Sequence, residues 1–133
     1  MSFITLAVAD VDVSRAFYVE GLGWQPILDA GEVIMLPVAE RLILSLWSVA
    51  GFAAELGEAP APGLAPITLS HNVATREEVD AVLREAAALG ARVNSAQQRE
   101  WGGYSGYFAD PDGFRWEIAV NPGETGAFVL PPR

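Results

Sequence analysis

The first part of the chain has the pattern of apolar and polar positions expected of a strand, a helix and three further strands. The predicted strands cover residues 3–8, 24–30, 32–38 and 41–49. After the first strand, Asp10 or Ser14 can cap a helix, and Phe17 belongs to its apolar side. Gly21 and Gly23 then end that helix. This part is therefore predicted to form a βαβββ unit.

The same order of elements returns in the second part of the chain. The predicted strands here cover residues 66–73, 91–101, 104–110 and 114–120. Thr75 and Glu78 form a capping box at the start of the intervening helix, and Gly90 ends it. The sequence Asp-Pro-Asp-Gly at residues 110–113 predicts a tight turn between the last two strands, because proline presets φ and glycine accepts a positive φ.

The two parts are interpreted as copies of one module. Ile4-Thr5-Leu6 in the first strand recurs as Ile67-Thr68-Leu69 in the second part, which equates Thr5 with Thr68. One domain is predicted, with module 1 at residues 1–56, a Pro- and Gly-rich linker at 57–66, module 2 at 67–121 and an irregular tail at 122–133. Neither module would bury its sheet well alone, so the two modules are expected to pair.

Composition narrows the class of protein. The chain has 133 residues, 51% of them hydrophobic, which is enough for a real core in one domain. Its net charge is −9, which argues against a nucleic-acid partner and favours the attraction of cationic ligands. There is no cysteine, and no apolar run approaches the roughly 20 residues of a membrane span. A cytoplasmic protein with no membrane partner is the expectation.

Two segments resemble a known family. The opening ITLAVADVDVSRAFYVEGLGW and the closing GYFADPDGFRWEI are similar to the vicinal oxygen chelate superfamily. That group contains glyoxalase I, extradiol dioxygenases, and fosfomycin and bleomycin resistance proteins. The resemblance covers residues 3–121 and implies an α+β fold, in which two βαβββ modules form cupped mixed sheets. It also implies a small-molecule site inside the cup and a homodimer.

The resemblance also implies where a metal would bind. In metal-dependent members the ligands come from the first and last strands of each module, and these positions fall on Phe3, Ser45, Pro66 and Glu117. Only Glu117 matches, since Phe3 and Pro66 cannot coordinate a cation. A catalytic divalent ion usually has about three protein ligands. We therefore predict no cofactor, with a divalent metal as the disfavoured alternative.

Strand alternation predicts which side chains line the cup. In the last strand, Arg115 and Glu117 fall on the face opposite Trp116 and Ile118, which are assigned to the core. Glu117 then either contacts a ligand or pairs with Arg115 or a backbone donor. The other residues predicted on cup faces are Thr5, Ala7, Trp47, Thr68, Ser70 and Asn72.

An aromatic cluster is a second candidate for ligand binding. Trp101, Tyr104 and Tyr107 surround Gly102 and Gly103. Trp101 can stack on a ligand, and the tyrosine hydroxyls can hydrogen-bond to it. The alternative is that these rings cover a sheet edge or a dimer surface.

His71 is the only histidine of the chain. Its parity in the strand assigns it to the helix-packed face, where it would hydrogen-bond to backbone near the strand end. A twist or bulge there would instead aim it into the pocket as an acid, a base or a ligand anchor.

Three functions remain open from the sequence. The favoured hypothesis is a protein of the bleomycin-resistance type that binds a small molecule without the usual metal site. The alternative is a lyase, isomerase or dioxygenase-type enzyme that uses Glu117 and His71, with or without a divalent metal. The third is an accessory module without a ligand.

Overall fold

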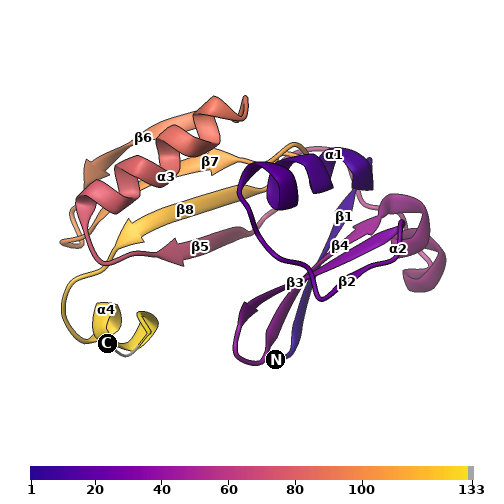
Figure 1. Cartoon of the computed structure of the whole chain (residues 1–133), viewed down its shortest axis with the longest axis horizontal. Helices are drawn as coiled ribbons and strands as arrows, with labels where there is room; N and C mark the ends of the chain where they lie inside the picture. The colour runs from indigo at the N-terminus through magenta and orange to yellow at the C-terminus, as the bar shows by residue number, and fades with distance from the viewer. Residues whose placement is uncertain (132–133) are drawn as a thin grey trace. The chain divides into compact units, whose positions relative to one another are not determined.

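The computed structural model describes residues 1–131 and divides into two units, Met1–Gly63 and Leu64–Arg133. Each unit contains one four-stranded mixed sheet with helices, as the repeat predicts (Figure 1). The division falls inside the segment expected to be a linker. No helix among the described residues is both long and apolar enough to cross a membrane.

The first unit has the strand order β1-β4-β3-β2. Its strands are β1 (Phe3–Val8), β2 (Leu28–Asp29), β3 (Val33–Ala39) and β4 (Leu42–Ser48). β1 runs parallel to β4, and the other pairs are antiparallel. The predicted helix begins as α1 (Val11–Arg15), continues as the π-helix η1 (Ala16–Gly21), and α2 (Val49–Leu56) follows β4.

Alternating apolar positions form the core of the first unit. Leu6 and Val8 of β1 are at most 3% exposed, and the buried positions of β3 and β4 join them. The adjacent aromatic residues Phe17 and Tyr18 of η1 are both buried, with their ring centroids 5.1 Å apart in an edge-to-face arrangement. The helix therefore contributes two large neighbouring rings to one small core.

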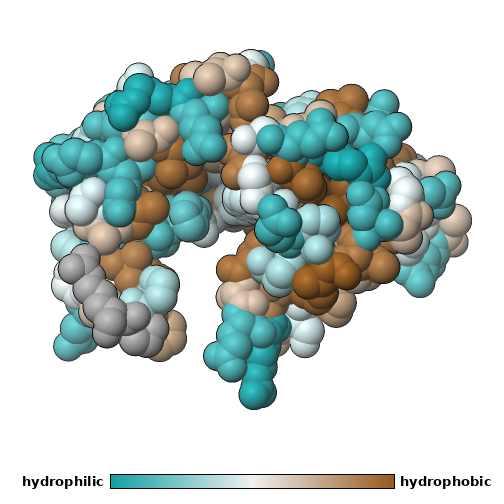
Figure 2. Space-filling model, in the orientation of Figure 1, coloured by the Kyte–Doolittle hydropathy of each residue, from teal (hydrophilic) through white to brown (hydrophobic). Residues whose placement is uncertain are grey.

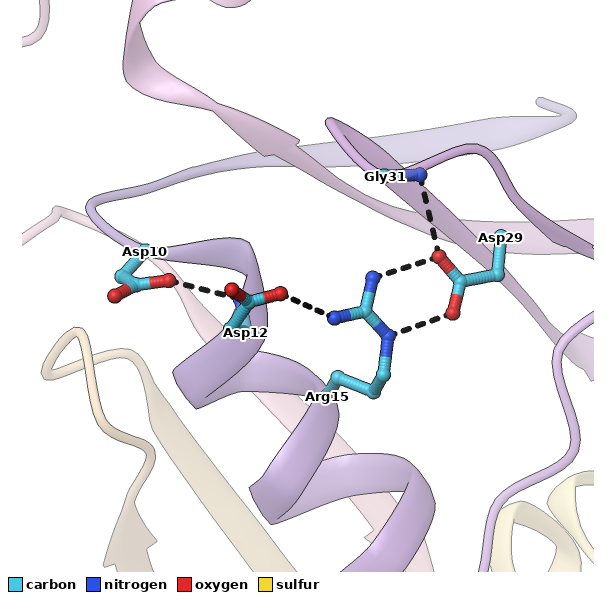
Figure 3. A network of polar contacts seen from close by, with 5 residues as sticks. All are labelled: Asp10, Asp12, Arg15, Asp29 and Gly31. Atoms are coloured by element: carbon cyan, nitrogen blue, oxygen red, sulfur yellow. Dashed lines mark hydrogen bonds and ion pairs between the residues drawn. The ribbon is translucent and has the colours of Figure 1, made fainter.

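Arg15 connects the first helix to the edge of the sheet (Figure 3). Its Nε and Nη2 donate to the two carboxylate oxygens of Asp29 at 2.6 and 2.7 Å, and its Nη1 donates to Asp12 at 2.5 Å. The N–H of Gly31 also donates to Asp29, at 3.3 Å. These contacts hold the pKa of the Asp29 carboxyl below its usual range, chiefly through the hydrogen bond from Arg15. Asp29 thus ties the short strand β2 to α1.

The second unit has the strand order β5-β8-β7-β6. Its elements are β5 (Thr68–Asn72), α3 (Arg76–Ala88), β6 (Val93–Gln98), β7 (Tyr104–Ala109), β8 (Arg115–Val120) and α4 (Gly123–Val129). The predicted capping box is present, because Thr75 Oγ1 accepts from the N–H of Glu78 and the Glu78 carboxylate accepts from the N–H of Thr75. α3 lies along one face of this sheet (Figure 1).

The core of the second unit lies between α3 and that face. Val79, Leu83 and Ala86 of α3 are at most 5% exposed. The buried sheet residues are Leu69, Phe108, Trp116 and Ile118. A Cβ at Gly106 would lie 2.5 Å from Leu83 Cδ1, so the glycine allows the helix to approach β7 closely. The opposite side of this sheet, which we call the open face, is the predicted cup face of module 2.

Two short helices differ from what the sequence led us to expect. α2 occupies residues read as the end of a strand and the start of a loop; Ser48 accepts a hydrogen bond from the N–H of Gly51 at its start, and Gly57 ends it with φ of 85°. α4 forms where an irregular tail was expected, and residues 132–133 of that tail lie outside the described residues.

Hydrophobic side chains reach the surface in both units (Figure 2). In the first unit these include Phe3, Ile27, Leu28 and Val38, and in the second Leu64, Ile67 and Phe128. Phe3 is 49% exposed although it begins the strand β1. It therefore contributes apolar surface at a position where the superfamily's metal-dependent members were expected to carry a ligand.

Candidate functional site

Glu117 lies in the middle of β8, which has β5 on one side and β7 on the other. In the strand registers, Glu117 is opposite both Ser70 of β5 and Tyr107 of β7. Ser70 Oγ donates to Glu117 Oε1 at 3.2 Å, and the Tyr107 hydroxyl donates to Glu117 Oε2 at 2.9 Å. The carboxylate is thus held by a hydroxyl from each neighbouring strand.

The local sequence explains why this carboxylate is on the open face. Successive side chains of a strand point to opposite faces. Trp116 and Ile118 are 6% and 1% exposed and pack in the core beneath α3, whereas Glu117 between them is half-buried. The apolar neighbours fix the register, because a slip by one residue would bury the carboxylate beneath the helix.

Arg99 brings a positive charge to the same face. Its Nε donates to Ser105 Oγ and its Nη2 to the Ser105 carbonyl oxygen, both at 2.9 Å. Its guanidinium carbon is 6.0 Å from the centre of the Tyr107 ring. The backbone N–H of Arg99 donates to the Gly103 carbonyl at 2.7 Å, which holds the tight turn between β6 and β7. Ser105 and Tyr107 are two residues apart on β7, so the guanidinium follows the open face along that strand.

The surroundings of Tyr107 favour the protonated form of its hydroxyl. Partial burial and the hydrogen bond to Glu117 raise the pKa of Tyr107 above its usual 10.0, and the charge of Glu117 adds to this. The nearby charge of Arg99 acts in the opposite direction. Tyr107 therefore stays a hydrogen-bond donor at neutral pH, and Glu117 remains the acceptor of the group.

The other open-face predictions in the second unit lie around this centre. Thr68 is opposite Arg115 in the parallel β5–β8 pair, and Arg115 Nη1 donates to the Gly113 carbonyl at 3.0 Å. Asn72 accepts a hydrogen bond from the side chain of Asn121. Arg115 therefore does not pair with Glu117, which was one of the alternatives that the sequence left open.

Tyr104 and Trp101 lie apart from Tyr107. Tyr104 is three residues before Tyr107 on β7, so strand alternation directs it to the other face. There its hydroxyl donates to Asp80 of α3 at 2.7 Å, and Arg76 lies over its ring at 5.0 Å. Trp101 is 50% exposed, and its ring lies so close to Gly103 that a Cβ there would clash. Of the predicted aromatic cluster, only Tyr107 reaches Glu117.

His71 is opposite Ile118 in the β5–β8 register, one position beyond the Ser70–Glu117 pair. Alternation therefore assigns it to the face that Ile118 and Leu69 share, as its parity in the sequence indicates. The side chain is exposed, yet desolvation of the ring lowers the pKa of His71 below its usual 6.5. His71 and Glu117 do not converge on one point of the open face.

The equivalent positions of the first unit have different chemistry. Thr5 is opposite Ser45 in the β1–β4 pair, and Ala7 is opposite Trp47. Ser45 is 4% exposed, and a Cβ at Gly51 of α2 would lie 2.4 Å from the Trp47 indole nitrogen. Trp47 is therefore packed against α2, and this face carries no ionisable side chain on β1 or β4.

The strand registers correct one metal position taken from the resemblance. Asp10 and Thr75 are the N-caps of the two equivalent helices, and aligning them equates Phe3 with Thr68. The strand registers agree with this alignment. Phe3 lies two residues before Thr5, which is opposite Ser45, and Thr68 lies two residues before Ser70, which is opposite Glu117. Pro66 lies before β5 begins. The Ile-Thr-Leu match is thus two residues out of structural register.

The residues at these positions do not fit a divalent metal. Phe3 has no donor atom, Ser45 and Thr68 offer only neutral hydroxyls, and Glu117 supplies a single carboxylate. Within residues 1–131 no group of three His, Cys, Asp or Glu side chains is arranged to hold an ion. We therefore derive no step that depends on a metal.

Sequence reasoning missed Arg99 and Ser105. Arg99 falls within the segment 91–101 that was predicted to be a strand, but β6 ends at Gln98 and Arg99 begins the turn, so strand alternation does not apply to its side chain. Ser105 follows directly from alternation, since it has the same parity as Tyr107. The signal for Ser105 was present, whereas the position of Arg99 required the turn geometry.

Comparison with known proteins shows which family and which fold the chain shares. The model of the Glyoxalase/Bleomycin resistance protein/Dioxygenase superfamily matches residues 1–118. A crystal structure of a glyoxalase-related enzyme from Fulvimarina pelagi is 35% identical, covering 92% of this chain and 88% of that chain, with a TM-score of 0.84. The chain matches none of the curated proteins with which it was compared.

More distant structures share the fold alone. The hypothetical protein SA1046 from S. aureus is 23% identical, with a TM-score of 0.79, covering 91% of this chain and 92% of that chain. Lactoylglutathione lyase from Agrobacterium tumefaciens is 22% identical, with a TM-score of 0.70, covering 90% of this chain and 91% of that chain. Similar backbones thus carry differently described proteins, and the site itself must support any function.

Proposed function

Because this chain belongs to the Glyoxalase/Bleomycin resistance protein/Dioxygenase superfamily, we propose that it binds a small molecule on the open face of the second unit without the usual metal. Glu117 receives a hydrogen-bond donor of the ligand, and a cationic amine suits it best. Tyr107 and Ser70 hold the carboxylate in position for that contact.

The observation that carries this proposal is a half-buried carboxylate without a cationic partner. Glu117 forms no ion pair with any residue between 1 and 131, and its two oxygens each accept one hydroxyl hydrogen bond. A carboxylate oxygen has two acceptor sites, so each oxygen can accept a further donor. Bonds in which one partner is charged are stronger than neutral ones, and a ligand amine would make such a bond. The net charge of −9 also steers cations toward the protein.

A second candidate function is an enzyme of the lyase or isomerase type. It is favoured by the Fulvimarina pelagi protein, which is described as a glyoxalase-related enzyme. Glu117 would then act as a base toward a bound substrate, with Tyr107 as the neighbouring proton donor. His71 gives this candidate little support, because it lies next to Ile118 in the strand register.

A thermal-shift screen with cationic aromatic compounds tests the binding proposal. A ligand present at about 100 times its Kd stabilises the folded protein by about 2.7 kcal/mol. We expect at least one compound to raise the melting temperature, and Glu117→Gln to abolish most of that rise. Glu85→Gln changes an exposed glutamate of α3 and serves as the matched control. If no compound raises the melting temperature, or if Glu117→Gln leaves the rise intact, the proposal is wrong.

Metal analysis separates the metal-independent binder from a metal enzyme. Purified protein without a bound divalent ion agrees with metal-independent binding. A near-stoichiometric ion that is lost in Glu117→Ala would contradict the binder and favour a metal enzyme with a different ligand set.

A further inference from the structure

Arg99 adds a second cation to the open face, in addition to Arg115, which lies two residues before Glu117 on β8. The guanidinium carbon of Arg99 lies 6.0 Å from the Tyr107 ring centre, and the Tyr107 hydroxyl lies 2.9 Å from Glu117 Oε2. One tyrosine side chain therefore separates the positive group from the negative group. The charges of both Arg99 and Glu117 act on the Tyr107 hydroxyl, in opposite directions.

Arg99 also retains donors that the protein does not use. Its Nε and Nη2 donate to Ser105, whereas Nη1 has no hydrogen-bond partner within residues 1–131. A guanidinium has five N–H donors, and two of them are engaged here. Ser105 is 1% exposed, so the two bonds to it hold the guanidinium in a fixed orientation on the sheet.

No acidic side chain neutralises this guanidinium. The ion pairs among residues 1–131 involve Arg15 and Arg41, and Arg99 takes part in none of them. A half-buried cation and a half-buried anion thus lie on either side of Tyr107 without neutralising each other directly. Such an arrangement is complementary to a molecule that itself carries both charges.

We propose that Arg99 determines the specificity of this site for zwitterionic ligands, which carry a carboxylate or a similar anionic group together with an amine. This inference rests on the proposed function, because the ligand amine occupies Glu117. The anionic group accepts hydrogen bonds from the free donors of Arg99, and Tyr107 lies beneath the body of the ligand. The net charge of −9 opposes a purely anionic ligand but leaves a neutral zwitterion unaffected.

Calorimetric titration with matched probes tests the inference. Two zwitterions differ in the separation of their charges: phenylalanine has a short separation and 4-(aminomethyl)benzoate a long one. Phenethylamine and benzylamine are the corresponding amines without a carboxylate. We expect at least one zwitterion to bind about tenfold more tightly than its amine, because it gains a charge-assisted hydrogen bond to Arg99.

Substitutions assign that gain to Arg99. We expect Arg99→Gln to remove the tenfold preference by weakening the binding of the zwitterion, while the binding of the amine is not weakened, because the substitution removes a positive charge that repels it. Arg99→Lys keeps the positive charge and should keep a part of the preference for the zwitterion. A preference retained in this variant shows that its loss in Arg99→Gln comes from the missing charge and not from a disturbed turn. Arg84→Gln removes an exposed arginine of α3 and should change neither affinity.

The outcomes distinguish this inference from the proposed function. If the amines bind through Glu117 and the zwitterions bind no more tightly, the role of Arg99 is wrong while the binding proposal stands. If the zwitterion preference survives Arg99→Gln, Arg99 is again excluded as its source. If none of the four probes binds at millimolar concentration, both this inference and the amine-binding proposal are overturned.

Discussion

The hydrogen bond between Tyr107 and Glu117 can be measured by a double-mutant cycle. Tyr107→Phe removes the hydroxyl that donates to Glu117 at 2.9 Å and keeps the ring. Glu117→Gln keeps the shape and an acceptor oxygen but removes the charge. The cycle of both single variants and the double variant therefore reports what the charge adds to this bond.

The expected magnitude follows from the surroundings of the pair. A hydrogen bond to a charged group contributes about 1.5–3 kcal/mol, and a neutral one about 0.5–1.5 kcal/mol. Both side chains are half-buried, so water competes and the lower part of each range applies. We expect Tyr107→Phe to cost about 1.5 kcal/mol in the native background and about 0.5 kcal/mol beside Glu117→Gln, a coupling of about 1 kcal/mol.

Urea denaturation followed by far-ultraviolet circular dichroism gives these free energies. With a urea slope of about 2 kcal/mol/M, the coupling corresponds to a midpoint difference of about 0.5 M. Ser70→Ala provides a control, because its bond to Glu117 is longer at 3.2 Å and lies at an exposed residue. It should cost about 0.5 kcal/mol or less. Equal costs of Tyr107→Phe in the two backgrounds, within about 0.3 kcal/mol, would refute the coupling.

Two further predictions concern titration and packing. Because the pKa of Tyr107 is raised in the folded state, the stabilisation by its protonated hydroxyl is present below pH 10 and is lost as the pH rises through the folded-state pKa. NMR with labelled tyrosine should show the pKa of Tyr107 falling toward 10.0 in Glu117→Gln. An unchanged pKa would contradict a contribution of Glu117 to the shift. Leu83→Ala should lower the free energy of unfolding by about 3 kcal/mol, because Leu83 is 5% exposed. Leu89→Ala, at a side chain that is 39% exposed, should cost less than about 1 kcal/mol. Similar melting temperatures for the two variants would mean that α3 is packed differently.

Local patterns in the sequence predicted the elements and the faces of the strands. Alternation assigned Trp116 and Ile118 to the core and Glu117 to the other face, and burial agrees with this. The capping box at Thr75 fixed the start of α3. Both signals depend on neighbours within a few residues, so they can be interpreted without knowledge of the fold.

Signals outside these patterns were harder to interpret. α2 begins at Val49 and is capped by Ser48, whose capping role was hidden because the apolar run of β4 leads directly into the helix. The Ile-Thr-Leu repeat equates Thr5 with Thr68, but three letters cannot fix a register. The N-caps Asp10 and Thr75 equate Phe3 with Thr68 instead. Strand pairing was needed to correct the repeat.

The partners of Glu117 could not be predicted for the same reason. Alternation gives the face of a side chain, but the register of pairing determines which residue lies beside it. Ser70 and Glu117 are 47 residues apart in the chain, and Tyr107 comes from the other neighbouring strand. Arg99 lies in a turn, so its direction depends on the backbone hydrogen bond to Gly103.

The corrected register also explains why the polar site belongs to only one of the two units. In the second unit, Glu117 on the last sheet strand is opposite Ser70 and Tyr107. The corresponding residue of the first unit is Ser45, opposite Thr5 and Met35, and these three side chains carry no charge. The same backbone arrangement thus supports a carboxylate held by two hydroxyls in one module and an uncharged, closely packed position in the other. A ligand amine finds its anionic partner at this position only in the second unit, and for this reason substitution of Ser45 should leave amine recognition intact where substitution of Glu117 removes it.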